Sequence, residues 1–581
     1  MLDNPLSMER IKELLSQFGH QDFLPLQQEA IETLVNGQDL LLISPTGGGK
    51  SLVYQLSALR LEGVAVIVCP LLALMSQQVE KLKSMGVRAE FLNSTLNPGE
   101  QDDLAMGLRR KSIDLLFLSP EKLLQPSVMG ILQHSAVAFV AIDEAHCIAQ
   151  WGEGFRPEYG SLGKIREEFG AVPIVAMSGS ADAKTQKQII NSLSLHEPKV
   201  LQHSFNRENI EINISQKKLA KKQLLNFILS QCYGESGIVY CRSRKKVETL
   251  SAWLNSQGIK SLFFHANISE QDKAANMKVF TEQSGVVMVA TSAFGMGLDF
   301  NAVRYVVHMD LPNSLESYYQ EIGRAGRDGL KAKALLLYGL QDVLTLLQFE
   351  MEVNLASVDD QARTYDFIRI LEGRGCRRRL MLNYFGEKIE DCGNCDRCLA
   401  KKKEHNLTIA AQKFLSLLHK TKGTLTISVM IQILLGKTTK AVKEVRGQEM
   451  KLFAKGQEIN EVMWKSLVRY LISHQYIAIY QFMPFQLLML EKAKALLTSK
   501  TQVILQEDTY VPNHDVAPFE DYKKQLFSWH LECEGISFSS KQLDLIVRHQ
   551  PKSFAAMSRL TGIAIHLIKK FEPPVYVASL D

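Results

Sequence analysis

The sequence has no apolar segment long enough to cross a membrane and no large excess of either charge. Its longest apolar run, Val64 to Met75, has about twelve residues and contains Pro70, whereas a spanning helix needs about 20 apolar residues. The opening residues MLDNPLSMERIKELLSQF contain acids and a proline and lack an apolar core, unlike a signal peptide. The net charge of +5 over 581 residues does not by itself indicate a nucleic-acid or membrane partner. We therefore expect a protein of the cytosol or nucleoid.

Cysteine is also scarce, and its placement is uneven. Five of the nine cysteines are scattered, and four lie between 376 and 398. In a reducing compartment we expect the scattered thiols to be inert core residues, whereas the cluster indicates a metal site rather than disulfides. Four thiolates suit tetrahedral Zn²⁺ with no open position, which predicts a structural site, and an iron–sulfur cluster would accept the same ligands. The ligands are Cys376, Cys392, Cys395 and Cys398.

The chain lacks internal repeats and low-complexity segments, and it is too long for one hydrophobic core. Two regions alternate short apolar runs with helical stretches, a pattern typical of buried parallel sheets with crossover helices. The expected strands of the first region are DLLLIS, VAVIVC, IDLLFLS, AVAFVAID and VPIVAMS. Those of the second region are GIVYC, SLFFH, VVMVATS, VRYVVHMD and KALLLYG.

These patterns predict an α/β chain with two parallel-sheet domains followed by smaller modules. After the two sheet domains in the sequence we expect a helical cysteine-rich unit. Helices and a hairpin (YIAIYQF and FQLLML) with the outline of a winged helix then follow. A polar linker and a small helical domain complete the chain. The predicted domains are residues 1–203, 204–343, 344–405 and 406–500, with a linker at 501–516 and the last domain at 517–581.

The segment SPTGGGKS joins a predicted strand to a predicted helix. Its glycines allow backbone N–H groups to approach phosphate oxygens at the positive end of the helix dipole. Lys50 would reach the β- and γ-phosphates, and the Ser51 hydroxyl would bind Mg²⁺. Ser44 stands where the strict phosphate-loop pattern has its first glycine, so a chance turn is the alternative. The residues expected at ATP are Thr46, Gly47, Gly48, Gly49, Lys50 and Ser51.

Two further segments complete a predicted site for ATP hydrolysis. Asp143 and Glu144 end the apolar strand of VAFVAIDEAHC; the first can hold Mg²⁺ through water and the second can deprotonate the attacking water. The segment YYQEIGRAGRDG carries Gln320, Arg324 and Arg327. Arg327 would cross the interdomain cleft as an arginine finger. Alone, this segment could equally end a surface helix with solvated arginines.

Positive charge concentrates between 401 and 455, where the sequence has twelve Lys or Arg and three Glu. This asymmetry favours a polyanion-binding surface, with a solvated helical surface as the alternative. Lys437, Lys440 and Arg446, with Lys443, would hold duplex phosphates. An apolar hairpin tip with Phe482, Pro484 and Phe485 could wedge a base pair apart or simply pack on its own domain. Phosphate contact or a solvated face is expected for Arg374, Arg377, Arg378 and Arg379.

In order and spacing these motifs resemble superfamily 2 helicases, and more narrowly the RecQ family of DNA helicases, over about 10–480. Beyond those already quoted, the resemblance rests on PLQQEAI, PLLALMSQQ, LNST, LSPEKLL, AQWGEGFRPEY, SGSAD, IVYCRSR, ATSAFGMGLDF and NYFGE…CGNCDRC. It implies two RecA-like domains, bound zinc, and ATP-driven 3′→5′ unwinding of single-stranded and forked DNA in repair, recombination and the SOS response. Expected partners are a single-stranded-DNA-binding protein or a topoisomerase, with the chain itself a monomer.

The resemblance also implies individual roles. Gln27 would read adenine and His146 would relay DNA occupancy to the nucleotide. Trp151, Phe155 and Arg156 would sense single-stranded DNA by stacking and charge, with a core anchor as the alternative for Trp151. The C-terminal segment resembles the HRDC domain.

The chain departs from the family pattern at two places. Leu24 stands in place of an arginine and SGSAD in place of T-A-T-A-D. These departures keep open an ATP-gated DNA-binding and remodelling scaffold with weak unwinding. An RNA helicase is the other rival, disfavoured by the aromatic-rich loop, the zinc unit and the winged helix.

Overall fold

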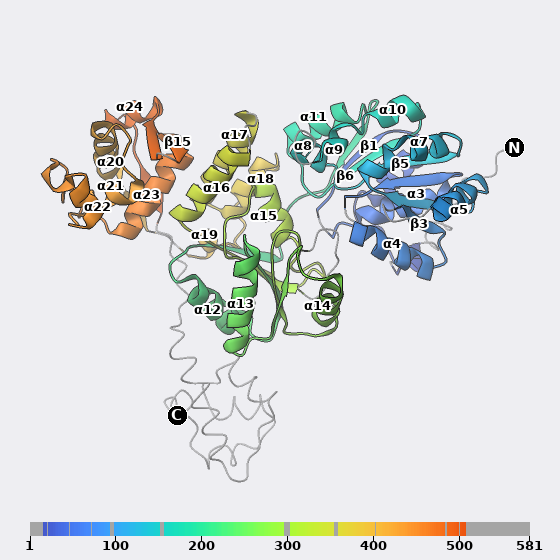
Figure 1. The fold of residues 1–581 in the computed structure, drawn as a ribbon, viewed down its shortest axis with the longest axis horizontal. Coiled ribbons are helices and arrows are strands. Elements are labelled where there is room, and N and C mark those ends of the chain that lie inside the picture. The colour runs from blue at the N-terminus through green and yellow to red at the C-terminus, as the bar shows by residue number, and fades with distance from the viewer. Residues whose placement is uncertain are drawn as a thin grey trace, which may run out of the picture.

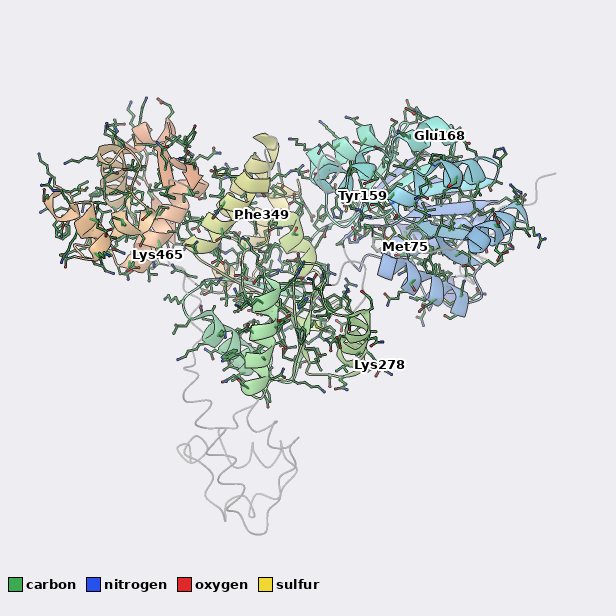
Figure 2. All side chains as sticks on the ribbon, in the orientation of Figure 1. Met75, Tyr159, Glu168, Lys278, Phe349 and Lys465 are labelled. Atoms are coloured by element: carbon green, nitrogen blue, oxygen red, sulfur yellow. The ribbon has the colours of Figure 1, made fainter. Side chains whose placement is uncertain are left out.

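A computed structural model of the chain describes residues 15–19, 21–45, 47–70, 72–92, 98–151, 156–294, 303–353, 358–400, 403–482, 485–498 and 500–506. In Figure 1 the second sheet domain and the helices that follow it lie between the first sheet domain and the winged helix. Figure 2 places Glu168 and Lys465 at opposite ends of this arrangement, with Phe349 between them. Among the described residues, no helix is long and apolar enough to span a membrane.

The first domain is built on a seven-stranded parallel sheet of order β3-β4-β2-β5-β6-β1-β7. Its strands are β1 Leu40–Ile43, β2 Val64–Val68, β3 Ala89–Leu92, β4 Leu115–Leu118, β5 Val137–Ile142, β6 Ile174–Ser178 and β7 Lys199–Gln202. Its helices are α2 Gln27–Val35, α3 Lys50–Arg60, α4 Leu72–Ser84, α5 Pro98–Arg109, α6 Pro120–Leu123, α7 Pro126–Gln133, α8 Cys147–Trp151, α9 Pro157–Gly160, α10 Lys164–Phe169 and α11 Ala183–Ser192.

Alternate strand residues enter two separate cores, so helices cover both faces of this sheet. In β1, Leu41 and Ile43 join the core shared with Ile165 of α10, and Leu40 and Leu42 join the core shared with α2 and α3. Because both faces are buried, the strands need near-continuous apolar residues, and this is why the runs predicted all five inner strands correctly. The two edge strands, β3 and β7, were not predicted. For β7 the reason is that it buries only one of its four residues.

The second domain holds a six-stranded parallel sheet of order β10-β11-β9-β12-β13-β8. Its strands are β8 Ile210–Gln216, β9 Ser236–Tyr240, β10 Ser261–Phe264, β11 Val287–Ala290, β12 Val303–His308 and β13 Ala332–Tyr338, and its helices are α12 Ala220–Gln231, α13 Arg244–Ser256, α14 Glu270–Glu282 and α15 Leu315–Ile322. The five predicted strands are present. The edge strand β8, with the alternating sequence IEINISQ, was missed.

A helical unit with the cysteine cluster follows, as expected. It contains α16 Leu340–Val353, α17 Val358–Glu372, α18 Arg377–Tyr384 and α19 Asp396–Leu399. The winged helix contains β14 Glu404–Asn406, α20 Thr408–Lys420, α21 Ile427–Leu434, α22 Lys440–Glu444, the short 3₁₀ helix η1 Gly447–Glu449, α23 Glu461–Ser473, β15 Ile477–Phe482, β16 Phe485–Met489, α24 Lys492–Leu497 and β17 Ile504–Gln506.

The predicted hairpin is confirmed, since β15 and β16 pair antiparallel. The prediction of a linker at 501–516 is wrong in its first part, because β17 at 504–506 pairs antiparallel with β14 and closes the winged helix. The polar residues in this stretch concealed a strand only three residues long. The C-terminal domain predicted at 517–581 lies outside the described residues.

Candidate nucleotide site and nucleic-acid interface

Predicted nucleotide residues of the first domain and Arg327 of the second line one cleft of about 500 Å³. The cleft lies at the carboxyl ends of the first sheet's strands, where α/β proteins bind ligands. Its walls include Leu24, Gln27, Gly47, Gly49, Lys50, Ser51, Asp143, Glu144 and Arg327. Arg327 comes from the second domain, and a Cβ placed on Gly47 would lie 3.5 Å from Arg327 Cγ. Thr46 lies outside the described residues.

Close packing explains the glycines of the loop and the serine that departs from the strict pattern. A Cβ on Gly48 would lie 2.1 Å from the Ser44 hydroxyl oxygen, so the side chain of Ser44 fills the space that residue 48 leaves empty. Gly47 and Gly49 have left-handed φ values of 84° and 69°, which glycine adopts without strain. Lys50 Nζ donates to the Ser44 carbonyl at 2.9 Å, so the ammonium group is held over the loop.

Gln27 is bound to both sides of the loop entrance. Its Oε1 accepts from the Leu24 backbone N–H at 2.7 Å, and its Nε2 donates to the Gly49 carbonyl at 3.0 Å. A Cβ on Gly49 would lie 2.1 Å from Gln27 Nε2. The glutamine and the loop therefore form one unit. Leu24, which is 46% exposed, replaces the cationic side chain of the family pattern in the wall of this cleft.

The pKa values of the two carboxylates are shifted in opposite directions. Asp143 follows β5, and its Oδ1 accepts from the Glu144 N–H at 2.9 Å. Burial and the charge of Glu144 raise the pKa of Asp143 to about 7. Burial alone would raise the pKa of Glu144 as well. The charges of His146, Lys50 and Arg324 outweigh burial and lower it. Glu144 is thus the more readily ionised of the two, as a general base requires.

A polar chain joins the carboxylates to the second domain through His146. This ring is 7% exposed, and burial lowers its pKa. Its Nδ1 lies 3.0 Å from the Ser178 hydroxyl and 3.4 Å from Glu144. Gln320 Nε2 lies 3.4 Å from His146 Nε2 and donates to the Ser180 hydroxyl at 2.9 Å. Both serines of SGSAD therefore use their hydroxyls, and the buried His146 ring contacts side chains of both domains.

The structure describes only part of the expected DNA sensor. Arg156 is held within the first domain, where its Nε donates to Glu121 at 2.6 Å and its Nη1 to the Pro70 carbonyl at 2.9 Å. Phe155 lies outside the described residues, as does the side chain of Trp151. The Arg156 guanidinium is therefore bound by partners within the first domain.

The four clustered cysteines are assembled as a metal site. Their sulfur atoms all lie within 4.8 Å of one another. Cys376 precedes α18, and its sulfur accepts from the backbone N–H of Cys392 at 3.3 Å and of Arg379 at 3.4 Å. Such donors stabilise thiolates, and the hydrogen bond from Cys392 lowers the pKa of Cys395 to about 4. Four thiolate donors without a carboxylate or water position suit Zn²⁺.

The arginines beside Cys376 do not form one surface. Arg377 is 1% exposed and paired with Asp396. Arg378 is 3% exposed and donates to backbone carbonyls of Arg207 and Ile210. Neither a solvated face nor phosphate contact fits these two, because burying an arginine requires internal partners. Sequence reasoning had no signal for those partners.

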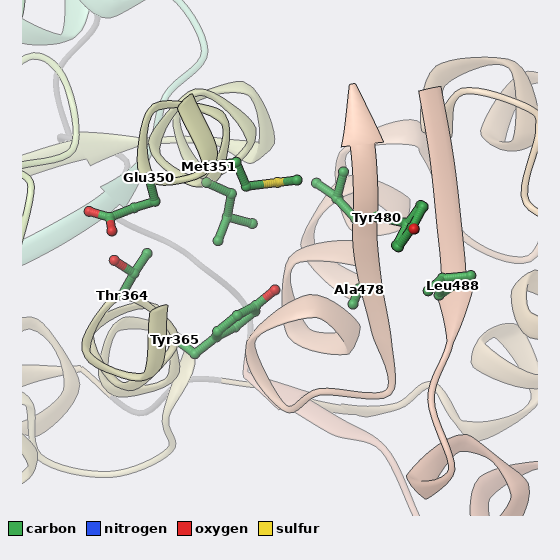
Figure 3. Close-up of a pocket in the computed structure, with 9 residues that line it drawn as sticks. Glu350, Met351, Thr364, Tyr365, Ala478, Tyr480 and Leu488 are labelled. Carbon is green, nitrogen blue, oxygen red and sulfur yellow. The ribbon is translucent and has the colours of Figure 1, made fainter. Parts of the chain in front are cut away.

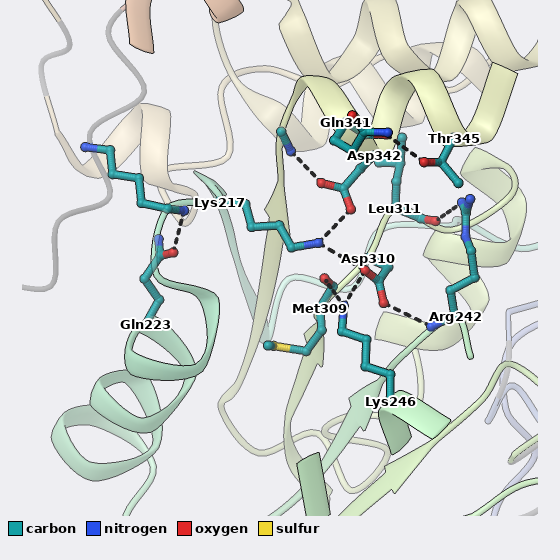
Figure 4. Close-up of polar contacts among 12 residues, drawn as sticks. Lys217, Gln223, Arg242, Lys246, Met309, Asp310, Leu311, Gln341, Asp342 and Thr345 are labelled. Carbon is teal, nitrogen blue, oxygen red and sulfur yellow. Dashed lines mark hydrogen bonds and ion pairs between the residues drawn. The ribbon is translucent and has the colours of Figure 1, made fainter. Parts of the chain in front are cut away.

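A second polar cluster was also missed, at the carboxyl ends of β9 and β12 (Figure 4). Asp310 accepts from Lys217 at 3.0 Å and from the Arg242 backbone N–H at 3.0 Å, and it also pairs with Lys246. These cations lower the pKa of Asp310 against the effect of its burial. The cluster fixes the loops beside Gln320 and Arg324, which line a neighbouring cleft of about 530 Å³.

The winged-helix residues predicted to hold duplex phosphates lie on the surface in ion pairs. Lys437 pairs with Glu461 at 2.6 Å and Arg446 with Glu449 at 2.7 Å, whereas the side chain of Lys440 is 93% exposed.

The β15–β16 hairpin faces helices α16 and α17 of the unit that carries the cysteine cluster, across a small cavity. Figure 3 shows this cavity of about 250 Å³ between β15 and helices α16 and α17, with Tyr365 pointing toward the hairpin. Tyr480 is 59% exposed and Phe485 is partly buried against the core. Pro484 and the side chain of Phe482 lie outside the described residues.

Comparison with known proteins gives four consecutive family matches. They are DEAD/DEAH box helicase over residues 24–189, helicase conserved C-terminal domain over 220–329, RecQ zinc-binding over 341–399 and RQC domain over 401–513. A Pasteurella multocida protein named ATP-dependent DNA helicase RecQ is 34% identical over 594 residues, covering 98% of this chain and 93% of that protein. Proteins of the same name from Haemophilus influenzae and Bacillus subtilis are 34% and 33% identical and cover 99% and 81% of this chain and 97% and 80% of their own lengths.

Proposed function

The chain belongs to the RecQ family of DNA helicases, and on that premise we propose that it couples Mg²⁺-ATP hydrolysis to 3′→5′ movement along single-stranded DNA and to duplex unwinding. The observation that carries the proposal is the composite cleft, in which Arg327 of the second domain lies beside the phosphate loop of the first. A site shared between two domains links nucleotide turnover to their relative movement.

Each group in the cleft has a distinct role in this proposal. Lys50 and the loop N–H groups hold the β- and γ-phosphates, and Ser51 and Asp143 hold Mg²⁺. Glu144 orients and deprotonates the attacking water. Arg327 neutralises charge on the γ-phosphate, supported by Arg324, which is 4% exposed.

Gln27 is proposed to read the adenine edge, because its amide is already fixed at the loop entrance. The side-chain contacts from Gln320 to His146 and from His146 to Glu144 are proposed to report DNA occupancy to Glu144.

Zinc would be held by the four cysteines and would supply a structural crosslink. The unit it closes packs between the second sheet and the winged helix. In particular, Tyr338 of β13 and Arg469 of α23 both contact Glu372 of α17, at 2.7 Å and 2.6 Å. The winged helix would then present its exposed cations to duplex phosphates ahead of the fork, at the chromosome in repair and recombination.

Fork-unwinding assays test this function. We expect unwinding of DNA forks with a 3′ single-stranded tail, dependent on ATP and Mg²⁺ and stimulated by single-stranded DNA. Forks with only a 5′ tail and RNA duplexes should remain paired, and the matched Lys50→Ala variant should be inactive. Strong ATP-dependent DNA binding without strand separation would instead support a remodelling scaffold, and unwinding of RNA duplexes would support an RNA helicase.

A further inference from the structure

The arginine segment after α15 is bound by a side chain from outside that segment. The backbone from 323 to 327 lies beyond the last residue of α15, Ile322, and carries both proposed catalytic arginines. The guanidinium of Arg207 donates hydrogen bonds to three carbonyls of this segment. Its Nη1 donates to the Gly323 carbonyl at 3.0 Å, and its Nη2 donates to those of Ala325 at 3.0 Å and Gly326 at 2.8 Å.

We propose that Arg207 is a positioning residue for the arginine finger, and that it links the zinc unit to the nucleotide site. The planar guanidinium can bind several carbonyls at once in fixed directions, which an ammonium group cannot. Its charge also complements the negative end of the α15 dipole. Arg207 contacts the backbone on both sides of Arg324 and directly before Arg327, so it sets where both side chains begin.

A neighbouring side chain supports the same backbone. Asn209 Nδ2 donates to the Gly326 carbonyl at 2.8 Å and to the Leu330 carbonyl at 2.9 Å. Gly326 has a left-handed φ of 61°, and a Cβ there would lie 2.4 Å from Asn209 Nδ2. The turn is therefore shaped around donors from the segment between the two sheets.

That segment is in turn held by the zinc unit. Arg378, in the first turn of α18 after Cys376, donates to the Arg207 carbonyl. Glu387 accepts from the Phe205 N–H at 2.8 Å and the Ser204 hydroxyl at 2.5 Å.

Aromatic packing reinforces this contact. Phe205 packs between Phe385 and Tyr319 of α15, with ring centroids 4.7 Å and 6.0 Å away. Contacts therefore run without a break from the metal site, through 204–207, to the arginine finger.

The inference rests on the proposed role of Arg327 at the γ-phosphate. An arginine finger contributes about 10³ to 10⁵ in kcat, and Arg207→Ala should lose part of that, roughly 10- to 100-fold. Arg207 does not line the nucleotide cleft, so the KM for ATP should stay within about twofold. Arg207→Lys should give an intermediate kcat, because the ammonium keeps the charge but lacks the planar fork that directs donors to three carbonyls at fixed positions.

The decisive readout is the affinity for two nucleotide ligands of the full-length, zinc-loaded protein. Affinity for ADP with aluminium fluoride, which mimics the transferring phosphoryl group, should fall with kcat in Arg207→Ala, while affinity for ADP alone should not change. The matched control is Arg369→Ala, since Arg369 is 52% exposed and pairs with Asp366 of its own helix; it should behave as the wild type. If Arg207→Ala loses its zinc or does not fold, Arg207→Lys carries the same comparison.

The outcomes separate the two hypotheses. Normal kcat in Arg207→Ala or in folded Arg207→Lys, beside an inactive Arg327→Ala, would overturn the positioning role alone. Equal losses for ADP and for the mimic would also overturn it, because they indicate general damage to the cleft. Normal kcat in Arg327→Ala would instead remove the finger assignment on which the inference depends.

Discussion

The arginine segment of the second domain and the basic surface of the winged helix use the same residue types under opposite constraints. Arg324 is 4% exposed, and its backbone is held by Arg207 and Asn209. Lys440 of the winged helix is 93% exposed. A γ-phosphate must be met at one point in space, whereas a duplex offers phosphates all along its length. Cations in the cleft should therefore control rate, and cations on the winged helix should control affinity and its salt dependence.

The largest effect is expected on the cleft side of this comparison. Lys50→Ala removes the ammonium that is held over the phosphate loop, and one transition-state contact of this kind contributes several kcal/mol. ATP turnover should become undetectable, whereas binding of forked DNA should change less than about threefold. Steady-state ATPase and fluorescence anisotropy measure the two. Near-normal turnover would show that phosphate is bound elsewhere.

Gly49→Ala should weaken nucleotide binding by roughly tenfold. The new Cβ would meet Gln27 Nε2, so the glutamine must leave the Gly49 carbonyl and its place at the entrance. Gly37→Ala is a matched control, because its φ of 81° carries the same left-handed strain and nothing lies within 4 Å of its Cβ. Each variant should lose about 1–2 kcal/mol of stability, but only the first should raise the KM for ATP. An equal effect of both on KM would attribute it to strain.

The sequence predicted most of the sheets and the phosphate loop, carboxylates and Arg327 that line the cleft for a shared reason. Buried parallel strands require apolar runs, and phosphate chemistry requires particular residues at fixed spacing, so both leave local patterns. Edge strands such as β7 and β8 are only partly apolar or alternate, and they were missed.

The side chains that hold the backbone of the site, such as Arg207, could not be predicted in the same way. Arg207 is more than a hundred residues from the carbonyls that it holds, and Arg378 from Arg207 likewise. Such pairs are defined by the folded packing of separate modules. For this reason the sequence predicts phosphate contact or a solvated face for the arginines beside Cys376, although two of them are buried.

On the winged-helix side, the triple substitution Lys437→Ala, Lys440→Ala and Arg446→Ala should reduce affinity for duplex DNA by roughly tenfold near physiological salt. Each lost phosphate contact should lower the slope of log K against log salt by about 0.9. ATP turnover at saturating single-stranded DNA should be unchanged. Titrations at several salt concentrations test this, and an unchanged slope would place the duplex on another surface.

The smallest effect is expected from Glu461→Gln. Hydrogen bonds from Lys437 and Lys465 lower the pKa of Glu461 to about 2. The ion pair is therefore present above the ordinary carboxyl pKa near 4.5 and is lost only as pH falls through about 2. Releasing Lys437 should raise DNA affinity about two- to threefold at low salt, equally at pH 6 and pH 8. A gain restricted to one of these pH values would contradict this assignment.

The most direct test of a composite site is the rate of the Arg327→Ala variant at saturating ATP and single-stranded DNA. Arg327 lies beside Gly47 of the other domain, so its loss should lower kcat by at least about 10³-fold. The affinities for ADP and for forked DNA should stay within about twofold of the wild type. A wild-type kcat would contradict the account, because it would mean that the first sheet domain hydrolyses ATP without the second.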